Sequence, residues 1–126
     1  MTPRSIAALR PTLLSALLGA ALLAAAPARA ETLETPSYTI VIKSHCVEGS
    51  VGCDNVGYTG TSKKSGKAIR LSGKTLHTTC ADGVTPCRFI GYEFKNGAVS
   101  YTVTDGGDLI VKSGRKVVLQ EHGEWK

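Results

Sequence analysis

The chain has 126 residues and four cysteines, with 15 Lys and Arg against 10 Asp and Glu, which makes the formal net charge +5. A chain of this length holds one small domain. Three of the arginines lie in an N-terminal export signal, and without that segment 12 basic residues face 10 acidic ones, a net charge of +2. The basic balance is therefore partly a targeting feature, and the sequence predicts no nucleic-acid partner.

The first thirty residues have the three parts of a cleavable secretory signal. Arg4 and Arg10 begin it, an apolar run over residues 13–26 follows, and Pro27 precedes the small residues at positions 28 and 30. The run of about 14 residues is shorter than the roughly 20 that span a bilayer, which disfavours the alternative of an uncleaved membrane helix. We expect cleavage after Ala30, hence a signal peptide over 1–30, a single β domain over 31–126 and no transmembrane anchor.

Export implies a periplasmic or secreted domain, and this mature part has 96 residues. A domain of that size has a small core and a thin margin of stability. An oxidising compartment allows disulfide bonds to add to that margin.

The mature chain alternates β-prone runs with turn signals. Strands are predicted at 38–43, 56–61, 68–71 and 74–79, then at 88–95, 98–104, 108–112 and 116–121. Lys63–Gly66 and Ser72–Gly73 are predicted turns, and Asn96-Gly97 predicts a hairpin with a type I′ turn. No helix is expected after residue 30. The sequence therefore predicts an all-β antiparallel meander that closes as a small barrel or a two-sheet sandwich.

The four cysteines form two Cys-x6-Cys segments that resemble each other, since each has an acidic residue followed by Gly after its first cysteine. Such a segment suits a tight loop closed by its own disulfide. We therefore favour the pairs Cys46–Cys53 and Cys80–Cys87. The crossed pairing of 46 with 80 and 53 with 87 stays open, because sequence alone does not choose between connectivities.

Two histidines lie beside these cysteines, His45 directly before Cys46 and His77 three residues before Cys80. Zinc sites usually bring paired ligands two to four residues apart, and the gaps here are six. Exported thiols also tend to oxidise. We expect no metal and no cofactor.

Catalytic motifs give no positive case for an enzyme. No Gly-x-Ser-x-Gly elbow, His-Glu-x-x-His pair or phosphate-binding glycine loop occurs in the sequence. Nucleophilic Cys–His chemistry would need a free thiol, whereas the four cysteines pair evenly. We predict a non-catalytic protein in which all three histidines, His122 included, lie on the surface.

The best candidate for a binding surface is a basic segment without acidic residues that carries Lys63, Lys64, Lys67, Arg70 and Lys74. On a hairpin, its first three lysines would gather at the tip and meet anionic lipid, an anionic glycan or an acidic protein. The alternative is a solvated turn whose lysines protect a sheet edge.

The single tryptophan, Trp125, stands one residue from the end of the chain. It is the second candidate for a partner contact, because exposed aromatic residues anchor interfaces. The alternative is that it closes one end of the core.

Residues 53–67, 80–87 and 91–97 resemble a group of small exported bacterial proteins of unassigned function, over about residues 40 to 125. In size, export and late strands the chain is also similar to the membrane-bound and periplasmic inhibitors of C-type lysozyme, which are small β-barrels. That family's Ser-Gly-x-x-Tyr motif is absent, because Ser72-Gly73-Lys74-Thr75 is followed by Leu76. The resemblance implies a fold and no inhibitory residue.

These observations favour an exported non-catalytic binding module, of the inhibitor or immunity-protein type, that acts through loops. The alternative is an envelope-associated structural or stress protein that contacts anionic lipid or glycan through the same lysines. The partner and the oligomeric state stay open.

Overall fold

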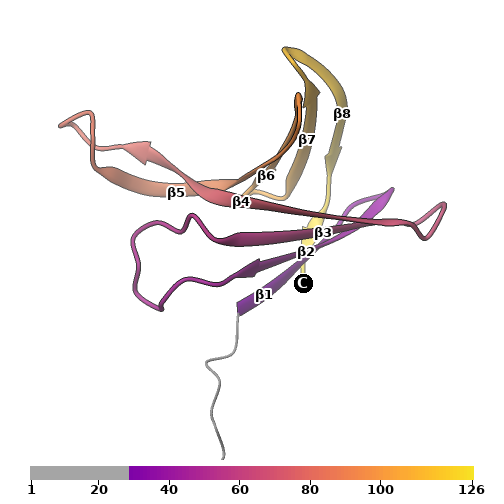
Figure 1. Cartoon of the computed structure of the whole chain (residues 1–126), viewed down its shortest axis with the longest axis horizontal. Coiled ribbons are helices and arrows are strands. Elements are labelled where there is room, and N and C mark those ends of the chain that lie inside the picture. Colours follow the sequence, from indigo (N-terminus) through magenta and orange to yellow (C-terminus); the bar gives the residue numbers. More distant parts are fainter. Residues whose placement is uncertain (1–28) are drawn as a thin grey trace, which may run out of the picture.

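The computed structural model describes residues 29–126, which form nine β-strands and no helix (Figure 1). The strands are β1 (Arg29–Glu34), β2 (Tyr38–Ser44), β3 (Val56–Ser62), β4 (Ala68–Thr79), β5 (Pro86–Asn96), β6 (Val99–Thr104), β7 (Asp108–Ser113), β8 (Lys116–His122) and β9 (Glu124–Trp125). The predicted all-β class is confirmed. Within the described part of the chain, no helix is long and apolar enough to cross a membrane.

The predicted signal falls almost wholly outside the described residues, which begin at its last two positions. Arg29 and Ala30 are the first residues of β1 and pair with Ser44 and Lys43 of β2. The sequence did not predict β1, because its six residues overlap the cleavage signal and include one β-branched residue, Thr32.

The strands form one antiparallel meander in the order β8-β7-β6-β5-β4-β3-β2-β1-β9. Only Gly123 separates β8 from β9, although these two strands occupy opposite edges of the sheet. The chain therefore bends from one edge to the other, and the sheet becomes a nearly closed barrel. A side chain at 123 would not fit this bend, because its Cβ would lie 2.1 Å from the carbonyl oxygen of Glu34.

The core lies on the concave face, where side chains alternate between inward and outward along each strand. Seven side chains are completely or almost completely buried, and burial of each contributes about 1.5–3 kcal/mol: Leu33, Ile40, Ile42, Val56, Phe94, Val103 and Leu109. Tyr58 joins them and packs at 5.0 Å between ring centroids against Phe94.

The predicted turn at Ser72–Gly73 is wrong, because β4 runs without interruption from Ala68 to Thr79. Gly73 instead permits close contact between strands, since a Cβ there would lie 2.0 Å from the carbonyl oxygen of Glu93. Phe94 of β5 pairs with Gly73 of β4, and its ring fills the space over Gly73. Here glycine marks a close approach within a strand.

The predicted hairpin between β5 and β6 is confirmed, but its turn lies one residue later than expected. Asn96 pairs with Val99, so Gly97 and Ala98 are the two loop residues. Gly97 has φ +62°, and no residue other than glycine has positive φ in the described range. Positive φ at the first loop residue alone is the pattern of a type II′ turn and not of the predicted type I′ turn.

Candidate binding site at the disulfide loops

Both disulfides are local, Cys46–Cys53 and Cys80–Cys87. The favoured pairing is confirmed and the crossed one is wrong. Each bond closes a loop whose ends are seven residues apart in sequence. No thiol is free to bind zinc, and among residues 29–126 no three His, Cys, Asp or Glu side chains gather as a metal ion would require.

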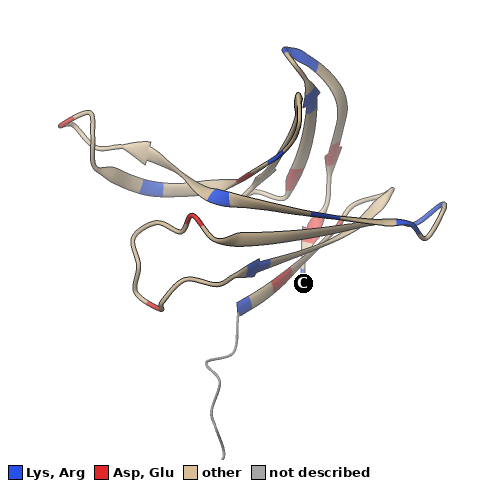
Figure 2. Ribbon diagram, in the orientation of Figure 1, with Lys and Arg blue, Asp and Glu red and all other residues tan. Residues whose placement is uncertain are grey.

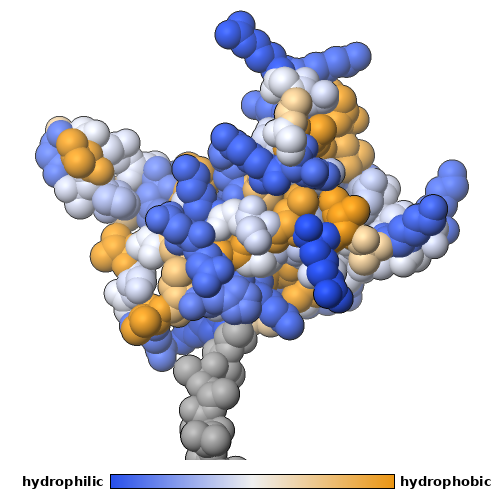
Figure 3. Space-filling view, in the orientation of Figure 1, coloured by the Kyte–Doolittle hydropathy of each residue, from blue (hydrophilic) through white to orange (hydrophobic). Residues whose placement is uncertain are grey.

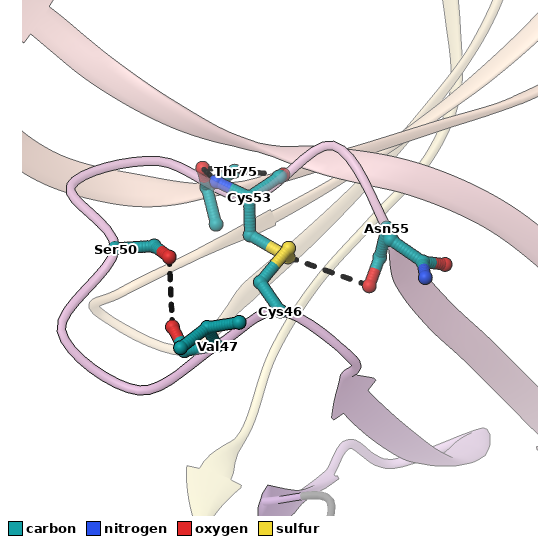
Figure 4. Close-up of a disulfide and its surroundings, with 6 residues drawn as sticks. All are labelled: Cys46, Val47, Ser50, Cys53, Asn55 and Thr75. Carbon is teal, nitrogen blue, oxygen red and sulfur yellow. Dashed lines mark hydrogen bonds between the residues drawn. A yellow bond between two sulfur atoms is a disulfide. The ribbon is translucent and has the colours of Figure 1, made fainter.

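The first disulfide loop (residues 46–53) is fastened to β4 (Figure 4). Thr75 makes the connection twice: its hydroxyl accepts a hydrogen bond from the Cys53 N–H at 2.9 Å, and its own N–H donates to the Cys53 carbonyl at 2.9 Å. Within the loop, the Ser50 hydroxyl donates to the Val47 carbonyl at 2.7 Å. Cys53 itself is 7% exposed and belongs to the core. The loop is therefore held at its base by the disulfide and by the sheet.

The second disulfide loop (residues 80–87) is braced by the carboxylate of Asp82. That carboxylate accepts hydrogen bonds from the Thr85 hydroxyl and from the N–H groups of Thr85 and Val84, both at 2.9 Å. These bonds, with the Thr85 hydroxyl first, lower the pKa of Asp82 to about 2. Asp82 is thus a permanent negative charge that organises its own loop.

The second loop lies at the tip of an arm formed by residues 77–89, where the β4–β5 hairpin extends beyond the body of the barrel (Figure 1). Register shifts lie between Leu76 and His77 and between His77 and Thr79. Irregularities of this kind bend a strand pair and change the direction of its side chains. Gly91, with φ +150°, lies at the base of the arm, where a Cβ would be 2.3 Å from the carbonyl oxygen of Val103.

A cleft of about 960 Å³ opens between the first disulfide loop and the base of this arm. Three aromatic rings line the cleft in a row. The ring centroid of Phe89 lies 5.7 Å from that of His77, edge-on, and 5.1 Å from that of Tyr92. The Tyr92 hydroxyl donates to Glu31 at 3.2 Å. Burial, followed by the nearby Glu31 charge, raises the pKa of Tyr92 to about 12, so its hydroxyl stays protonated.

Apolar side chains are exposed on both loops at this end of the molecule. Val47 and Val84 are each 82% exposed, Val51 is 68% exposed and Phe89 is 36% exposed. The two loops project on the same side of the ribbon (Figure 1), and hydrophobic surface is visible at the tip of the arm (Figure 3). Val47 and Val51 of the first disulfide loop line the cleft, whereas Val84 is exposed on the second loop, outside the lining of the cleft.

The charges of the two ends of the barrel differ (Figure 2). The first disulfide loop and the residues just after it carry Glu48 and Asp54, and the second loop carries Asp82. The basic hairpin turn between β3 and β4 lies at the end of these two strands that is opposite to the disulfide loops. Arg29 pairs with Glu48 at 3.0 Å and Arg88 directly follows the second loop, so the acidic residues of the two loops have basic residues beside them.

The structure brings Lys63, Lys64 and Lys67 to the β3–β4 turn, as the sequence predicts. Lys63 does not extend freely, because its ammonium group donates to the Thr35 carbonyl at 2.6 Å and pairs with Glu34 at 2.9 Å. Lys64 and Lys67 are exposed. The turn is therefore anchored on one side by Lys63 and presents its other lysines to solvent.

Arg70 and Lys74 do not join this turn. Both are exposed positions of β4, separated from the turn along the strand and alternating with the inward Leu71 and Gly73. Trp125 lies in β9, partly buried against the core, and its indole N–H donates to the Asp105 carbonyl at 3.0 Å. The five basic residues and the tryptophan thus lie on three different parts of the surface.

The histidines also separate. His45 and His77 line the cleft, whereas His122 pairs with Asp108 at 2.8 Å on β7 and β8. The exposed loop valines were missed by sequence analysis, although each lies inside a Cys-x6-Cys segment next to turn residues. An apolar residue in a short loop closed by a disulfide has little room to turn inward, and this was the available signal.

Comparison of the chain with models of protein families, with curated proteins and with solved structures gives no match.

Proposed function

We propose that this chain is an exported binding module that recognises a protein partner through the two disulfide loops and the cleft between the first loop and the β4–β5 arm. Two formed disulfides are consistent with a periplasmic or secreted location, where such bonds persist. The observation that carries the proposal is the exposure of Val47, Val51 and Val84 on loops that are covalently closed.

Exposed apolar side chains on closed loops suit recognition because less conformational freedom is lost when the partner binds. The Thr75 and Asp82 hydrogen bonds restrict the loops further. Phe89 lines the cleft and is 36% exposed, so it supplies an aromatic contact of the kind that often carries much of the binding energy of an interface. The loops therefore have both the rigidity and the apolar anchors that an interface needs.

The partner would present an apolar segment that enters the cleft, flanked by basic groups. Asp54 and Asp82, which form no ion pair within residues 29–126, would lie opposite those groups and accelerate association. A module of this kind acts as an inhibitor or immunity protein when the segment it covers belongs to another protein's active site. This is the form of binding that we favour.

The experiment is a capture from the producing organism's own envelope and extracellular fractions, with three baits compared. The first is the protein as the cell processes it, the second carries Val47→Asp with Val84→Asp, and the third carries Val117→Asp with Val118→Asp. Val117 and Val118 are also exposed, at 46% and 54%, but lie on β8 away from the loops. We expect one protein in stoichiometric amount with the first and third baits and its loss with the second.

A fourth bait, with Lys63, Lys64 and Lys67 changed to Ser, tests the basic turn as the protein-binding surface. Capture by this bait with loss by the loop variant supports the disulfide loops. Loss by the lysine variant together with capture by the loop variant would contradict the proposal and assign the partner to the turn.

A further inference from the structure

A second cavity, a groove of about 470 Å³, lies on the concave face of the barrel. It includes Ser62 and Lys67 beside the basic β3–β4 turn. One wall comes from β2, β3 and β4, and the other from β6, β7 and β8. Small-molecule sites commonly have volumes of about 300–1,000 Å³. This groove is therefore large enough for a small ligand and lies apart from the disulfide loops.

The walls of the groove are apolar. Five aliphatic side chains line it, together with tyrosines from both walls: Ile69, Leu109, Val111, Val118 and Leu119. Ile69 and Val118, from opposite walls, are 39% and 54% exposed. With the neighbouring Val117, they are the exposed large hydrophobic residues that do not belong to the disulfide-loop end. Apolar surface is thus left open to water on both sides of one groove.

Tyr58 makes part of the floor. Its ring contacts those of Phe94 and Tyr101, at centroid distances of 5.0 and 5.6 Å, and lies over Gly60, where a Cβ would be 2.6 Å from the hydroxyl oxygen. Burial raises the pKa of Tyr58. The floor is thus a buried, neutral aromatic ring, 2% exposed, which suits an apolar chain.

The rim of the groove is basic. Lys67 lines the groove itself, and Lys64 lies in the same turn. Elsewhere on the same sheet, the β7–β8 hairpin also carries positive charge, with Arg115 in its turn and Lys116 at the start of β8 (Figure 2). Glu34, an acidic residue of β1 that contacts the β3–β4 turn, is already paired with Lys63. The charge at the opening is thus complementary to an anion.

From this combination we propose that the groove binds a single-chain amphiphile with an anionic head group, one molecule per chain. The hydrocarbon chain lies along the aliphatic walls over Tyr58, and the head group lies beside the ammonium group of Lys67. Burial of the chain supplies most of the affinity. The charged contact orients the ligand and selects anions over cations. The occupant is the free amphiphile and not a bilayer surface.

The test compares two probes that share a chain length and differ in charge, decanoate and decyltrimethylammonium, both below the concentration at which they form micelles. Binding is followed by NMR through the side-chain signals of Tyr58, Tyr101 and Val118. We expect saturable one-to-one binding of decanoate and at least about tenfold weaker binding of the cation, the usual scale for one charge-assisted contact. Equal affinities, or signal changes that never saturate, would overturn the proposal.

Two variants and a matched control locate the site. Val118→Glu places a carboxylate in the groove at an exposed position, and Lys67→Gln removes the charge at the rim. Lys74→Gln removes a lysine from the outer face of the same strand pair. We expect the first two to weaken decanoate binding by about tenfold or more, with an unchanged circular dichroism spectrum, and the control to leave it unaltered. Equal weakening by Lys74→Gln would mean that only net charge matters and would refute the site.

Vesicles separate a free amphiphile from a membrane surface. Sedimentation with vesicles of phosphatidylcholine and phosphatidylglycerol measures surface binding, which falls with salt because exposed charges are screened. We expect decanoate to bind at a salt concentration that abolishes any sedimentation with vesicles. Sedimentation that Val118→Glu leaves unchanged, combined with no binding of decanoate, would show the lipid surface to be the occupant instead.

Discussion

The hydroxyl of Ser37, in the turn between β1 and β2, donates a hydrogen bond of 2.6 Å to the carboxylate of Glu121 on β8. The two residues are 84 positions apart in sequence. The same carboxylate also accepts from the Ser37 N–H at 3.1 Å and from the hydroxyl of Thr35 at 2.9 Å. Thr35 is 2% exposed and is the buried polar residue of the described core. Glu121 thus links β8, at one edge of the sheet, to the turn between β1 and β2 near the other edge.

Glu121→Ala removes a charged acceptor and leaves the hydroxyl and N–H of Ser37 without their partner, whereas the Thr35 hydroxyl keeps the Tyr38 carbonyl as an acceptor at 3.2 Å. We expect the free energy of unfolding to fall by about 1.5–3 kcal/mol, the usual range for hydrogen bonds to a charged group. Urea denaturation gives the value. Glu124→Ala is the control, because Glu124 is exposed on the neighbouring β9, and an equal loss there would argue against a role for Glu121 in closure.

Stability is expected to fall in acid through two carboxylates. Burial acts to raise the pKa of Glu121, but the hydrogen bonds from Ser37 and Thr35 outweigh it, and the pKa lies below the ordinary 4.5. The hydrogen bond from Lys63 likewise lowers the pKa of Glu34 below its ordinary value. A lowered pKa in the folded state stabilises the fold above the unfolded pKa, and that stabilisation is lost as pH falls through the folded value.

We therefore expect the Tm to change little from neutral pH to about 5 and then to decrease as these carboxylates take up protons. Thermal unfolding of the protein and of Glu121→Gln across this range measures the effect. The variant should start with a lower Tm and decrease less steeply. Parallel curves would show that Glu121 does not contribute to the acid sensitivity.

Gly73→Ala tests the close contact between β4 and β5. The added Cβ would lie 2.0 Å from the Glu93 carbonyl oxygen, a backbone atom that cannot rotate away. Overpacking typically costs about 1–3 kcal/mol and sometimes more, and we expect the upper part of that range. Gly57→Ala is the matched control in the adjacent strand, because its Cβ would approach no atom closer than 3.6 Å. Similar midpoints of urea unfolding for the two variants would contradict this assignment.

The two disulfides should contribute unequally to stability. Each closes a loop of the same length, for which chain entropy gives about 2–3 kcal/mol. Replacing Cys46 and Cys53 by Ser also introduces polarity at a core position, since Cys53 is 7% exposed. The second loop lies on the arm, where local opening does not require the barrel to unfold. We expect Cys46→Ser with Cys53→Ser to lower the unfolding midpoint by more than Cys80→Ser with Cys87→Ser, and equal losses would contradict this.

Much of the strand pattern is readable from the sequence because it is local. In β6, apolar and polar residues alternate from Val99 to Thr104, and a glycine near each end marks a turn. The two Cys-x6-Cys segments likewise predict local loops, since a short segment with turn residues brings its own ends together. A local signal is ambiguous where it has two structural causes. Gly73 is such a case, because glycine serves both turns and close contacts between strands.

The candidate site was only partly predictable for the same reason. The lysines at 63, 64 and 67 lie at a turn as expected, but the sequence contains no sign that Lys63 is held by Glu34 and Thr35. The sequence also gives no means of knowing that loops around residues 47 and 84 project on one side. That arrangement depends on the order of the strands and on the bend of the β4–β5 arm.

The sequence by itself determined the β class and the meander of this protein and favoured the local disulfides, because alternation, turn residues and short loops are properties of neighbouring positions. The tertiary structure alone decided the closure through Glu121 and Gly123, the cleft beside the arm and the apolar groove below Lys67. These features arise from the accumulated twist and curvature of nine strands, which bring together residues that no local pattern relates.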